Sequence, residues 1–287
     1  MKTLGIDTSN YTTSAALCDN GKLTGVQLPL PVPEGALGLR QSDAVFHHVR
    51  QLPEALRRLD LSGVQAIGVS VRPRAAEGSY MPCFLAGESA ARLLGQSLGV
   101  PVRKFSHQQG HLAAAALGSG HAELLDGNFL AWHVSGGTTE LLLVDKLNAQ
   151  IIGGTTDLCA GQLIDRVGKT LGLPFPSGQA LEKLSGGLQP VKIKNTGLKF
   201  SLSGYENKAR TESNAASFVL SVIAQSLINA TETAKALYDL PVLCSGGVMS
   251  NKYLQDCVDA YFAPPEYSRD NAMGAAYLAC RGEEWTA

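Results

Sequence analysis

Apolar runs separated by polar turns predict two β-hairpins, one in each half of the chain. Strands are predicted at residues 3–6 and 13–17 on either side of the polar stretch 7–12, and at residues 129–134 and 140–144 around Gly136-Gly137. Further short strands are predicted at 67–71, 100–105, 151–152 and 241–244. The repetition indicates two halves, each of which begins with a hairpin.

Helical periodicity alternates with these strands. Val45, Val49, Leu52 and Leu56 recur at the spacing of one helix face and predict a helix over 42–59. Similar patterns predict helices over 87–98, 159–171, 215–238 and 251–260, together with one that contains His107 and a small-residue helix from Asn271. This alternation predicts an α/β protein.

Composition narrows the class of protein. A chain of 287 residues with 45% apolar content favours two subdomains, and a net charge of −1 argues against binding nucleic acid through a general basic field. The six cysteines show no C-x-x-C spacing, which predicts reduced packing cysteines. No apolar run approaches the roughly 20 residues that span a bilayer, and residues 1–7 show no signal segment, so we expect a cytoplasmic protein.

His107 and His111 lie four residues apart, so both imidazoles can reach one cation from a single helix face. A polar helix face that binds nothing is the alternative that the pair alone leaves open. Gln108 stands where a zinc protease of the H-E-x-x-H type has its glutamate, which disfavours proteolysis. His47, His48 and His121 are expected on the surface.

Three polar or glycine-rich turns are candidates for binding a nucleotide. They are Asp7-Thr8-Ser9, Ser135-Gly136-Gly137-Thr138-Thr139 and Ser245-Gly246-Gly247, and each can direct backbone N–H groups or hydroxyls at an anion. Their order resembles the two phosphate loops and the adenosine loop of the actin, sugar kinase and heat-shock ATPase superfold.

Collinear motifs narrow the resemblance to one family. They are Gly5-Ile6-Asp7-Thr8-Ser9, His107-x-x-Gly110-His111-Leu112, Val134-Ser135-Gly136-Gly137-Thr138, Ala160-Gly161-Gln162-Leu163-Ile164-Asp165-Arg166, Leu171-Gly172-Leu173-Pro174, Phe200-Ser201-Leu202-Ser203-Gly204, Gly246-Gly247-Val248-x-x-Asn251-Lys252-x-Leu254 and Asp270-Asn271-Ala272-Met273. The chain resembles the catalytic subunit of tRNA threonylcarbamoyladenosine synthase, a family formerly called glycoproteases. The matching motifs extend over nearly the whole chain.

The resemblance implies an actin-like ATPase superfold of two duplicated α/β domains around a nucleotide cleft. The domains would comprise 1–105 with 264–287, and 106–263. The implied reaction transfers a threonylcarbamoyl group from threonylcarbamoyl-AMP to the adenosine beside the tRNA anticodon. The implied partners are tRNA, a paralogous subunit and an ATPase helper, with no membrane. Lys192, Lys194, Lys199, Lys208 and Arg210 are candidates for contacts with tRNA phosphates, although such a run is also typical of a solvated face.

The resemblance also implies roles for single residues. The ligands of one divalent ion, iron or zinc, would be His107, His111 and Asp270. The catalytic residues would be Asp7 and Asp165, and the adenylate, or another ATP- or AMP-type nucleotide, would bind at His133, Val134, Ser135, Gly136, Gly137, Thr138, Asp165, Gly178 and Asn251. Five of these residues have a structural alternative. Asp165 could be a carboxylate on a helix face, Gly178 a turn glycine and Asn251 a helix cap. Asp270 could be a loop carboxylate and His133 a hydrogen-bonded core histidine.

Several positions depart from the family pattern. The first hairpin lacks the acidic residues usual after Thr8-Ser9, Gln162 and Arg166 replace Glu and Lys, and Arg72-Pro73-Arg74 stands where the family has Gly-Pro-Gly-Leu. Two alternatives to tRNA modification therefore remain. One is a paralogue that binds metal and nucleotide but uses another acceptor or hydrolyses its substrate, and the other is a non-catalytic partner subunit.

Overall fold

The computed structural model describes residues 1–9, 11–32, 39–268 and 272–283. The chain divides into two compact units. Unit 1 comprises Met1–Ala114 with Arg269–Ala287, and unit 2 comprises Ala115–Ser268. None of the helices formed by the described residues combines the length and the apolar run that crossing a membrane requires.

Unit 1 contains a five-stranded mixed sheet. Its strands are β1 (Lys2–Asp7), β2 (Thr12–Asp19), β3 (Lys22–Pro29), β4 (Ala66–Arg72) and β5 (Val102–Ser106), in the order β3-β2-β1-β4-β5. β1, β2 and β3 form an antiparallel meander, whereas β1, β4 and β5 run parallel to one another. The carboxyl ends of β1, β4 and β5 therefore lie at the same edge of the sheet.

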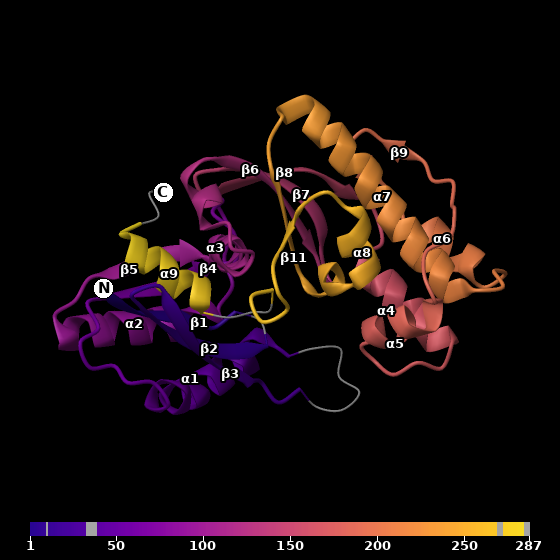
Figure 1. The fold of residues 1–287 in the computed structure, drawn as a ribbon. Helices are drawn as coiled ribbons and strands as arrows, with labels where there is room; N and C mark the ends of the chain where they lie inside the picture. Colours follow the sequence, from indigo (N-terminus) through magenta and orange to yellow (C-terminus); the bar gives the residue numbers. More distant parts are fainter. Residues whose placement is uncertain (10, 33–38, 269–271, 284–287) are drawn as a thin grey trace. The chain divides into compact units, whose positions relative to one another are not determined.

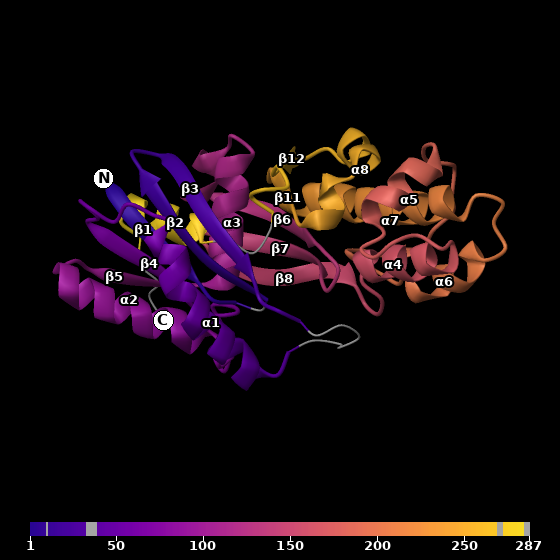
Figure 2. The same cartoon turned by 90° about the horizontal axis from the view of Figure 1, so that it is seen from below.

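Helices cover both faces of this sheet (Figure 2). Strand alternation points Leu4, Ile6 and Leu17 toward α1 (Gln41–Arg57) and α2 (Phe84–Leu98), with which they form one apolar core. The intervening Ala16 and Cys18 face α9 (Met273–Arg281) on the other side. Unit 1 is thus a three-layer α/β structure.

Two glycines bring α9 unusually close to the sheet. A Cβ at Gly5 would lie 2.2 Å from the carbonyl oxygen of Ala272, and one at Gly68 would lie 2.1 Å from that of Ala275. Real side-chain atoms do not approach backbone this closely, so the absence of a Cβ at both positions allows the helix to dock.

Unit 2 repeats the strand order of unit 1. Its sheet contains β6 (Asn128–Val134), β7 (Thr139–Asp145), β8 (Asn148–Thr155), β9 (Asn195–Thr196), β10 (Lys199–Phe200), β11 (Val242–Ser245) and β12 (Tyr261–Phe262). The order is β12-β11-β6-β7-β8-β10-β9, in which β6, β7 and β8 form an antiparallel meander and β11 lies parallel to β6. The segment β8-β7-β6-β11-β12 matches β3-β2-β1-β4-β5, so the α/β core is duplicated.

Helices α4 (Ala160–Thr170), α5 (Gly178–Ser185), α6 (Ser203–Ala209) and α7 (Ala215–Tyr238) gather beside this sheet (Figure 1). Trp132, Leu163 and Val219 are completely buried in the core between them. Unit 2 also contains η1 (Ala122–Asp126), η2 (Gly247–Ser250) and α8 (Lys252–Cys257), and α3 (His107–Gly118) crosses the limit between the two units. The long helix α7 begins at Ala215 because the Asn214 side chain accepts a hydrogen bond from Ser217 N at 3.0 Å.

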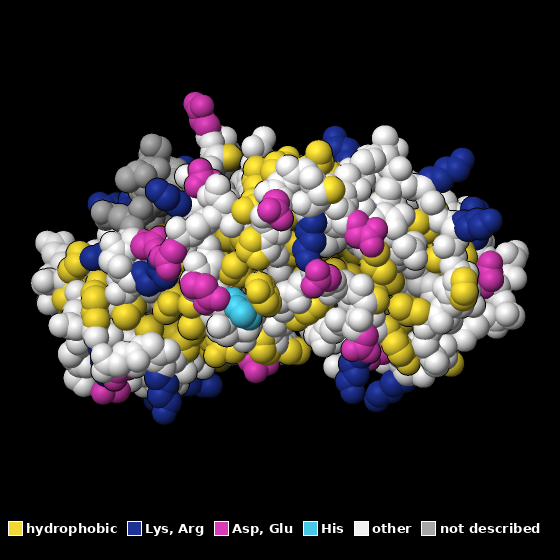
Figure 3. Space-filling model, turned by 45° about the horizontal axis from the view of Figure 1, so that its top comes forward, with side chains coloured by type: hydrophobic (Ala, Val, Ile, Leu, Met, Phe, Trp, Pro, Cys, Tyr) yellow, Lys and Arg dark blue, Asp and Glu magenta, His cyan; other side chains and the backbone are white. Residues whose placement is uncertain are grey.

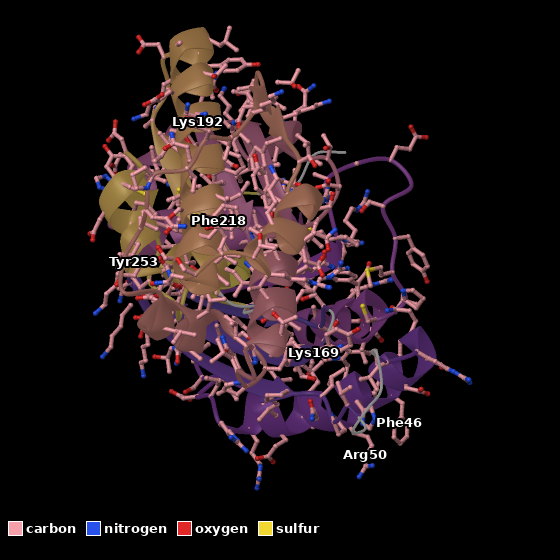
Figure 4. The ribbon with its side chains drawn as sticks, turned by 90° about the vertical axis from the view of Figure 1, so that its right-hand side faces the viewer. Phe46, Arg50, Lys169, Lys192, Phe218 and Tyr253 are labelled. Atoms are coloured by element: carbon pink, nitrogen blue, oxygen red, sulfur yellow. The ribbon has the colours of Figure 1, made fainter. Side chains whose placement is uncertain are left out.

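Charged side chains of both signs are interspersed on the surface shown in Figure 3. This face therefore carries no extended field of one sign, in keeping with the net charge of −1. Phe46 and Arg50 project outward together from α1, with the guanidinium carbon 5.5 Å from the ring centre (Figure 4).

The α/β class and both hairpins agree with the sequence prediction, but several details differ. β3, α5 and α6 were not predicted, and the helix expected over 251–260 ends at Cys257. His48, expected on the surface, is completely buried, and its Nδ1 lies 2.8 Å from Thr13 Oγ1. This hydrogen bond satisfies Nδ1 of a ring that the apolar face of α1 places in the core.

Candidate functional site

Asp7, His107 and His111 form a continuous row at the carboxyl edge of the sheet in unit 1. Asp7 Oδ2 lies 2.8 Å from His107 Nδ1, and His107 Nε2 lies 2.9 Å from His111 Nε2. Asp7 is 1% exposed, and the His107 side chain is 13% exposed. The carboxylate accepts a hydrogen bond from Nδ1–H of His107, which leaves the lone pair of this imidazole on Nε2.

The local sequence explains why the two imidazoles converge. β1 and β5 end at the same edge of the sheet, and α3 begins with His107 directly after β5. Ser106 and Gln109 form a capping box: Gln109 N donates to Ser106 Oγ at 3.2 Å, and Ser106 N donates to Gln109 Oε1 at 2.8 Å. This cap fixes the first turn of α3 and thereby the direction of His107, and His111 follows one turn later.

The segment after β4, where the resemblance implies a Gly-Pro-Gly-Leu loop, also holds this helix. Gln108 N donates to the carbonyl oxygen of Pro73 at 3.0 Å, and Arg74 N donates to Ser79 Oγ at 3.0 Å. The segment after β4 therefore supports α3 through backbone contacts, although its sequence differs from that of the family.

Asp7 is ionised in this environment. Burial favours the neutral carboxyl group, but electrostatic attraction to His107 and the hydrogen bond from its ring outweigh burial and lower the pKa of Asp7 below its ordinary value. Ser9 N donates a further hydrogen bond to Asp7 Oδ1 at 2.8 Å. The carboxylate is thus fully engaged in orienting its neighbours.

The donor set of this row suits a transition metal. Two imidazole nitrogens lie about 3 Å apart when both bind one ion at ordinary bond lengths, close to the 2.9 Å between the two Nε2 atoms. A carboxylate on the far nitrogen of a ligand histidine is the usual outer support of such sites. The described residues contain no group of three or more His, Cys, Asp or Glu side chains able to hold a metal, and Asp270, the third expected ligand, lies outside them.

In unit 2, the turn Ser135–Thr138 follows β6 and exposes its backbone. Ser135 N donates to the carbonyl oxygen of Thr138 at 2.8 Å, and Gly136 and Gly137 are exposed. The amino end of α4 lies against this turn. A Cβ at Gly161 would lie only 2.5 Å from the Ser135 carbonyl oxygen, so the glycine permits this close packing. Exposed turn amides beside a helix N-terminus suit a phosphate group.

The end of β11 lies beside the end of β6. His133 pairs with Ser245 across the two strands, and its Nδ1 lies 3.3 Å from Ser245 Oγ. Gly246 has φ +99°, and a Cβ there would lie 2.3 Å from the carbonyl oxygen of Val134. The structure therefore brings His133, Val134 and the two glycine turns together at one edge of the sheet.

Asp165, Gly178 and Asn251 have identifiable structural contacts. Asp165 Oδ1 accepts a hydrogen bond from Ser177 N at 2.8 Å, directly before Gly178 begins α5. Asn251 is 8% exposed and caps α8 by accepting from Leu254 N at 3.2 Å. The helix-cap interpretation of Asn251 is thus confirmed, and the nucleotide roles of these three residues stay predictions.

Gln162, where the resemblance implies a glutamate, takes part in the cap of α4. Its Oε1 accepts a hydrogen bond from Cys159 N at 3.3 Å, which completes a capping box. Arg166, the other replacement in this motif, pairs with Glu206 at 3.0 Å. Both substitutions are accommodated by local contacts within unit 2.

Asp157 is a structural carboxylate that the sequence interpretation missed. Its carboxylate accepts hydrogen bonds from the hydroxyls of Ser201 and Ser203 and from Leu202 N, the last at 2.8 Å. Desolvation opposes the charged form, but these hydrogen bonds prevail and lower the pKa of Asp157. Asp157 thereby anchors the motif segment that precedes α6. The only sequence signal for this role of Asp157 was its position just before the helix predicted over 159–171.

The Asp157→Asn variant should lose more stability at neutral pH than at pH 3, where the contribution of Asp157 has begun to fall. The folded-state pKa of Asp157 lies below the ordinary 3.8, so its contribution is present above that value and is lost as pH falls through the lowered pKa. We expect a loss of about 1 kcal/mol at pH 7, because exposure to solvent limits the gain. Urea unfolding at pH 7 and pH 3 measures the change in the free energy of unfolding, with Asp145→Asn as control. An equal loss at both pH values would contradict this account.

The duplicated α/β core, with polar turns at equivalent strand ends, places the chain in the actin-like ATPase superfold. The chain is similar to the ROK hexokinase from Thermus thermophilus, with a TM-score of 0.54 and 18% identity over 99% of this chain and 100% of the hexokinase. At this identity the likeness shows the fold alone.

Sequence comparison then identifies the family. The family model described as tRNA N6-adenosine threonylcarbamoyltransferase matches residues 42–277. The enzymes of that name from Methanopyrus kandleri and Bacillus subtilis are 29% and 31% identical to this chain. The matches cover 86% and 93% of this chain and 77% and 83% of the two relatives. The chain therefore belongs to the tRNA N6-adenosine threonylcarbamoyltransferase family, a family of acyltransferases.

Proposed function

We propose that this protein transfers a threonylcarbamoyl group from threonylcarbamoyl-AMP to the adenosine beside the tRNA anticodon, in a metal-dependent reaction. Membership of the family supports the reaction class. The convergence of His107 and His111, with Asp7 behind His107, is the observation that carries the metal dependence.

His107 and His111 would hold one divalent ion, iron or zinc, through their Nε2 atoms, with Asp270 as the third ligand. When bound, the ion would supply a Lewis acid that polarises the carbonyl group under attack. Asp7 does not contact substrate in this proposal. It is a positioning residue, because its carboxylate fixes the tautomer and ring direction of His107.

The turn Ser135–Thr138 would bind the phosphate of the adenylate through its backbone N–H groups, beside the amino end of α4. In the transfer, the exocyclic amine of adenosine forms a bond to the carbamoyl carbon and loses a proton, and the bond from that carbon to the phosphate oxygen breaks. AMP leaves with the negative charge, which turn amides stabilise.

Binding of tRNA would use the exposed basic residues around α6. Lys192, Lys194, Lys199, Lys208 and Arg210 are all exposed, and Lys208 lies 5.2 Å from the ring centre of Tyr205. Cations beside an aromatic ring suit a nucleic-acid backbone and its bases. A paralogous partner subunit and an ATPase helper stay predictions of the family resemblance.

The deciding experiment combines metal content with turnover. Purified protein is loaded with Fe²⁺ or Zn²⁺ and incubated with threonylcarbamoyl-AMP and tRNA, with and without the paralogous subunit. Modified nucleoside and released AMP are then measured. The proposal expects tRNA-dependent AMP release and modification, which disappear when the target adenosine is replaced by guanosine. AMP release without modification would indicate another acceptor, and a failure to bind either metal would overturn the metal site.

The Asp7→Asn variant should bind the metal more weakly while it remains folded. Without the negative charge, His107 is no longer held with its lone pair on Nε2, and we expect about a 10- to 100-fold loss of metal affinity. A competition titration with a chelator measures this loss, and Asp43→Asn in α1 is the control. A lower unfolding temperature with unchanged metal affinity would show that Asp7 is merely structural.

A further inference from the structure

Two cysteine thiols meet inside unit 1, where α9 packs on the sheet. Cys18 lies on β2 and is completely buried, whereas Cys280 lies in the last turn of α9 and is half-buried. Cys280 packs against the small apolar cluster that contains Cys18, Ala272 and Ala276. Both thiols are free, and no disulfide joins them in the structure.

The register of β1 and α9 explains this meeting. Thr3 is the partner of Cys18 across β1 and β2, and its Oγ1 donates to the carbonyl oxygen of Ala276 at 2.7 Å. Cys280 lies four residues after Ala276, on the same helix face and one turn farther along. Its Sγ lies 3.7 Å from the carbonyl oxygen of Met1. Cys280 is therefore placed at the end of β1 that adjoins Cys18.

The close approach of α9 to the sheet favours a disulfide between the two elements. Gly5 and Gly68 let the helix backbone approach the strands to distances that any side chain would prevent. A disulfide requires Cβ atoms about 4 Å apart, which a helix and a sheet separated by larger side chains do not reach. A thiol pair at this location thus differs from cysteines that only fill core space.

We propose that Cys18 and Cys280 form a reversible disulfide that ties α9 to β2. The oxidant is a low-molecular-weight disulfide such as oxidised glutathione. The Cys280 thiolate attacks one sulfur of the oxidant, which forms a mixed disulfide and releases one thiolate. Cys18 then loses its proton and attacks Cys280 Sγ, which forms the protein disulfide and releases the second thiolate. The two protein thiols are oxidised, and the low-molecular-weight disulfide is reduced to two thiols.

Exposure and acidity assign the order of the two attacks. Cys280 is accessible to a small oxidant, whereas Cys18 is not. Burial, and then the neighbouring Cys280 thiol, raise the pKa of Cys18 to about 11, so Cys18 is a poor first nucleophile. Cys18 instead resolves a mixed disulfide that forms beside it.

Non-reducing peptide mapping after incubation with oxidised glutathione tests the proposal. Trypsin places Cys18 in peptide 3–22 and Cys280 in peptide 270–281. We expect a joined peptide whose mass is the sum of the two less two hydrogens, and dithiothreitol should separate it. The oxidised protein should also unfold at a temperature higher by about 5 °C or more, because the bridge restricts the unfolded chain.

Three variants complete the test. The C280S protein should form no bridge and take up no glutathione at Cys18. The C18S protein should retain glutathione on Cys280, because the resolving thiol is absent. The C257S protein, which lacks a half-buried cysteine of unit 2, should form the bridge as the unmodified protein does. Stable glutathione on Cys280 of the unmodified protein, a disulfide between two molecules, or no reaction at either cysteine would overturn the proposal.

Discussion

The His107→Ala protein should lose the proposed metal and, with it, nearly all transferase activity. Loss of one imidazole removes a proposed ligand and also leaves the buried Asp7 carboxylate without its imidazole partner. Removal of an outer support already costs about 10- to 100-fold in metal affinity, so loss of a ligand should exceed about 100-fold. Elemental analysis of the purified protein, followed by the AMP-release assay on the same preparation, measures both effects.

His121→Ala is the matched control for this experiment. His121 belongs to unit 2, where its ring stacks on Tyr261 and its Nδ1 lies 2.8 Å from Glu123. Its removal should leave metal content and turnover unchanged. Equal metal content in His107→Ala and the unmodified protein would show that the histidine pair is not the metal site. Loss of activity with metal retained would assign His107 a different role.

The Gly68→Ala protein should be severely destabilised. The added methyl group would lie 2.1 Å from the carbonyl oxygen of Ala275 and 3.1 Å from Ala279 Cβ. The closest obstacle is helix backbone, which cannot rotate away as a flexible side chain can, so α9 must move off the sheet. We expect a loss of about 3 kcal/mol or more in the free energy of unfolding, at the upper end for overpacking. Urea unfolding followed by circular dichroism measures it.

Gly127→Ala separates this effect from a general effect of glycine replacement. Gly127 is exposed, has φ −135°, and a Cβ there would meet no atom within 4 Å. An alanine at this position should change stability by less than about 0.5 kcal/mol. If Gly68→Ala proved as stable as Gly127→Ala, the close docking of α9 on β4 would be wrong.

The sequence predicted the elements whose burial follows a regular period. The helix expected over 215–238 matches α7, since an apolar run bounded by Asn214 and Asp239 leaves few alternatives. β3 was missed because Lys22–Pro29 is an edge strand without a buried residue, so its side chains follow no buried alternation. α5 and α6 are short, and tertiary contacts with α7 rather than intrinsic periodicity determine them.

The candidate site was predicted only where its partners are close in sequence. The spacing of His107 and His111 predicts their convergence directly. The contact of Asp7 with His107 joins residues separated by 100 positions, and only the parallel arrangement of β1, β4 and β5 brings the two together. His48 was expected on the surface, but it lies on the buried face of α1 with Ala44 and Leu52, and its hydrogen-bonding partner Thr13 comes from β2.

The docking of α9 on β1 and β4 has a consequence for folding during synthesis on the ribosome. All strands of unit 1 are translated first, but the helix that covers one face of their sheet is translated after the whole of unit 2. Unit 2 is continuous in sequence and can complete its core while synthesis proceeds. The nascent first unit must meanwhile keep the apolar face around Ala16 and Cys18 uncovered until the last segment emerges.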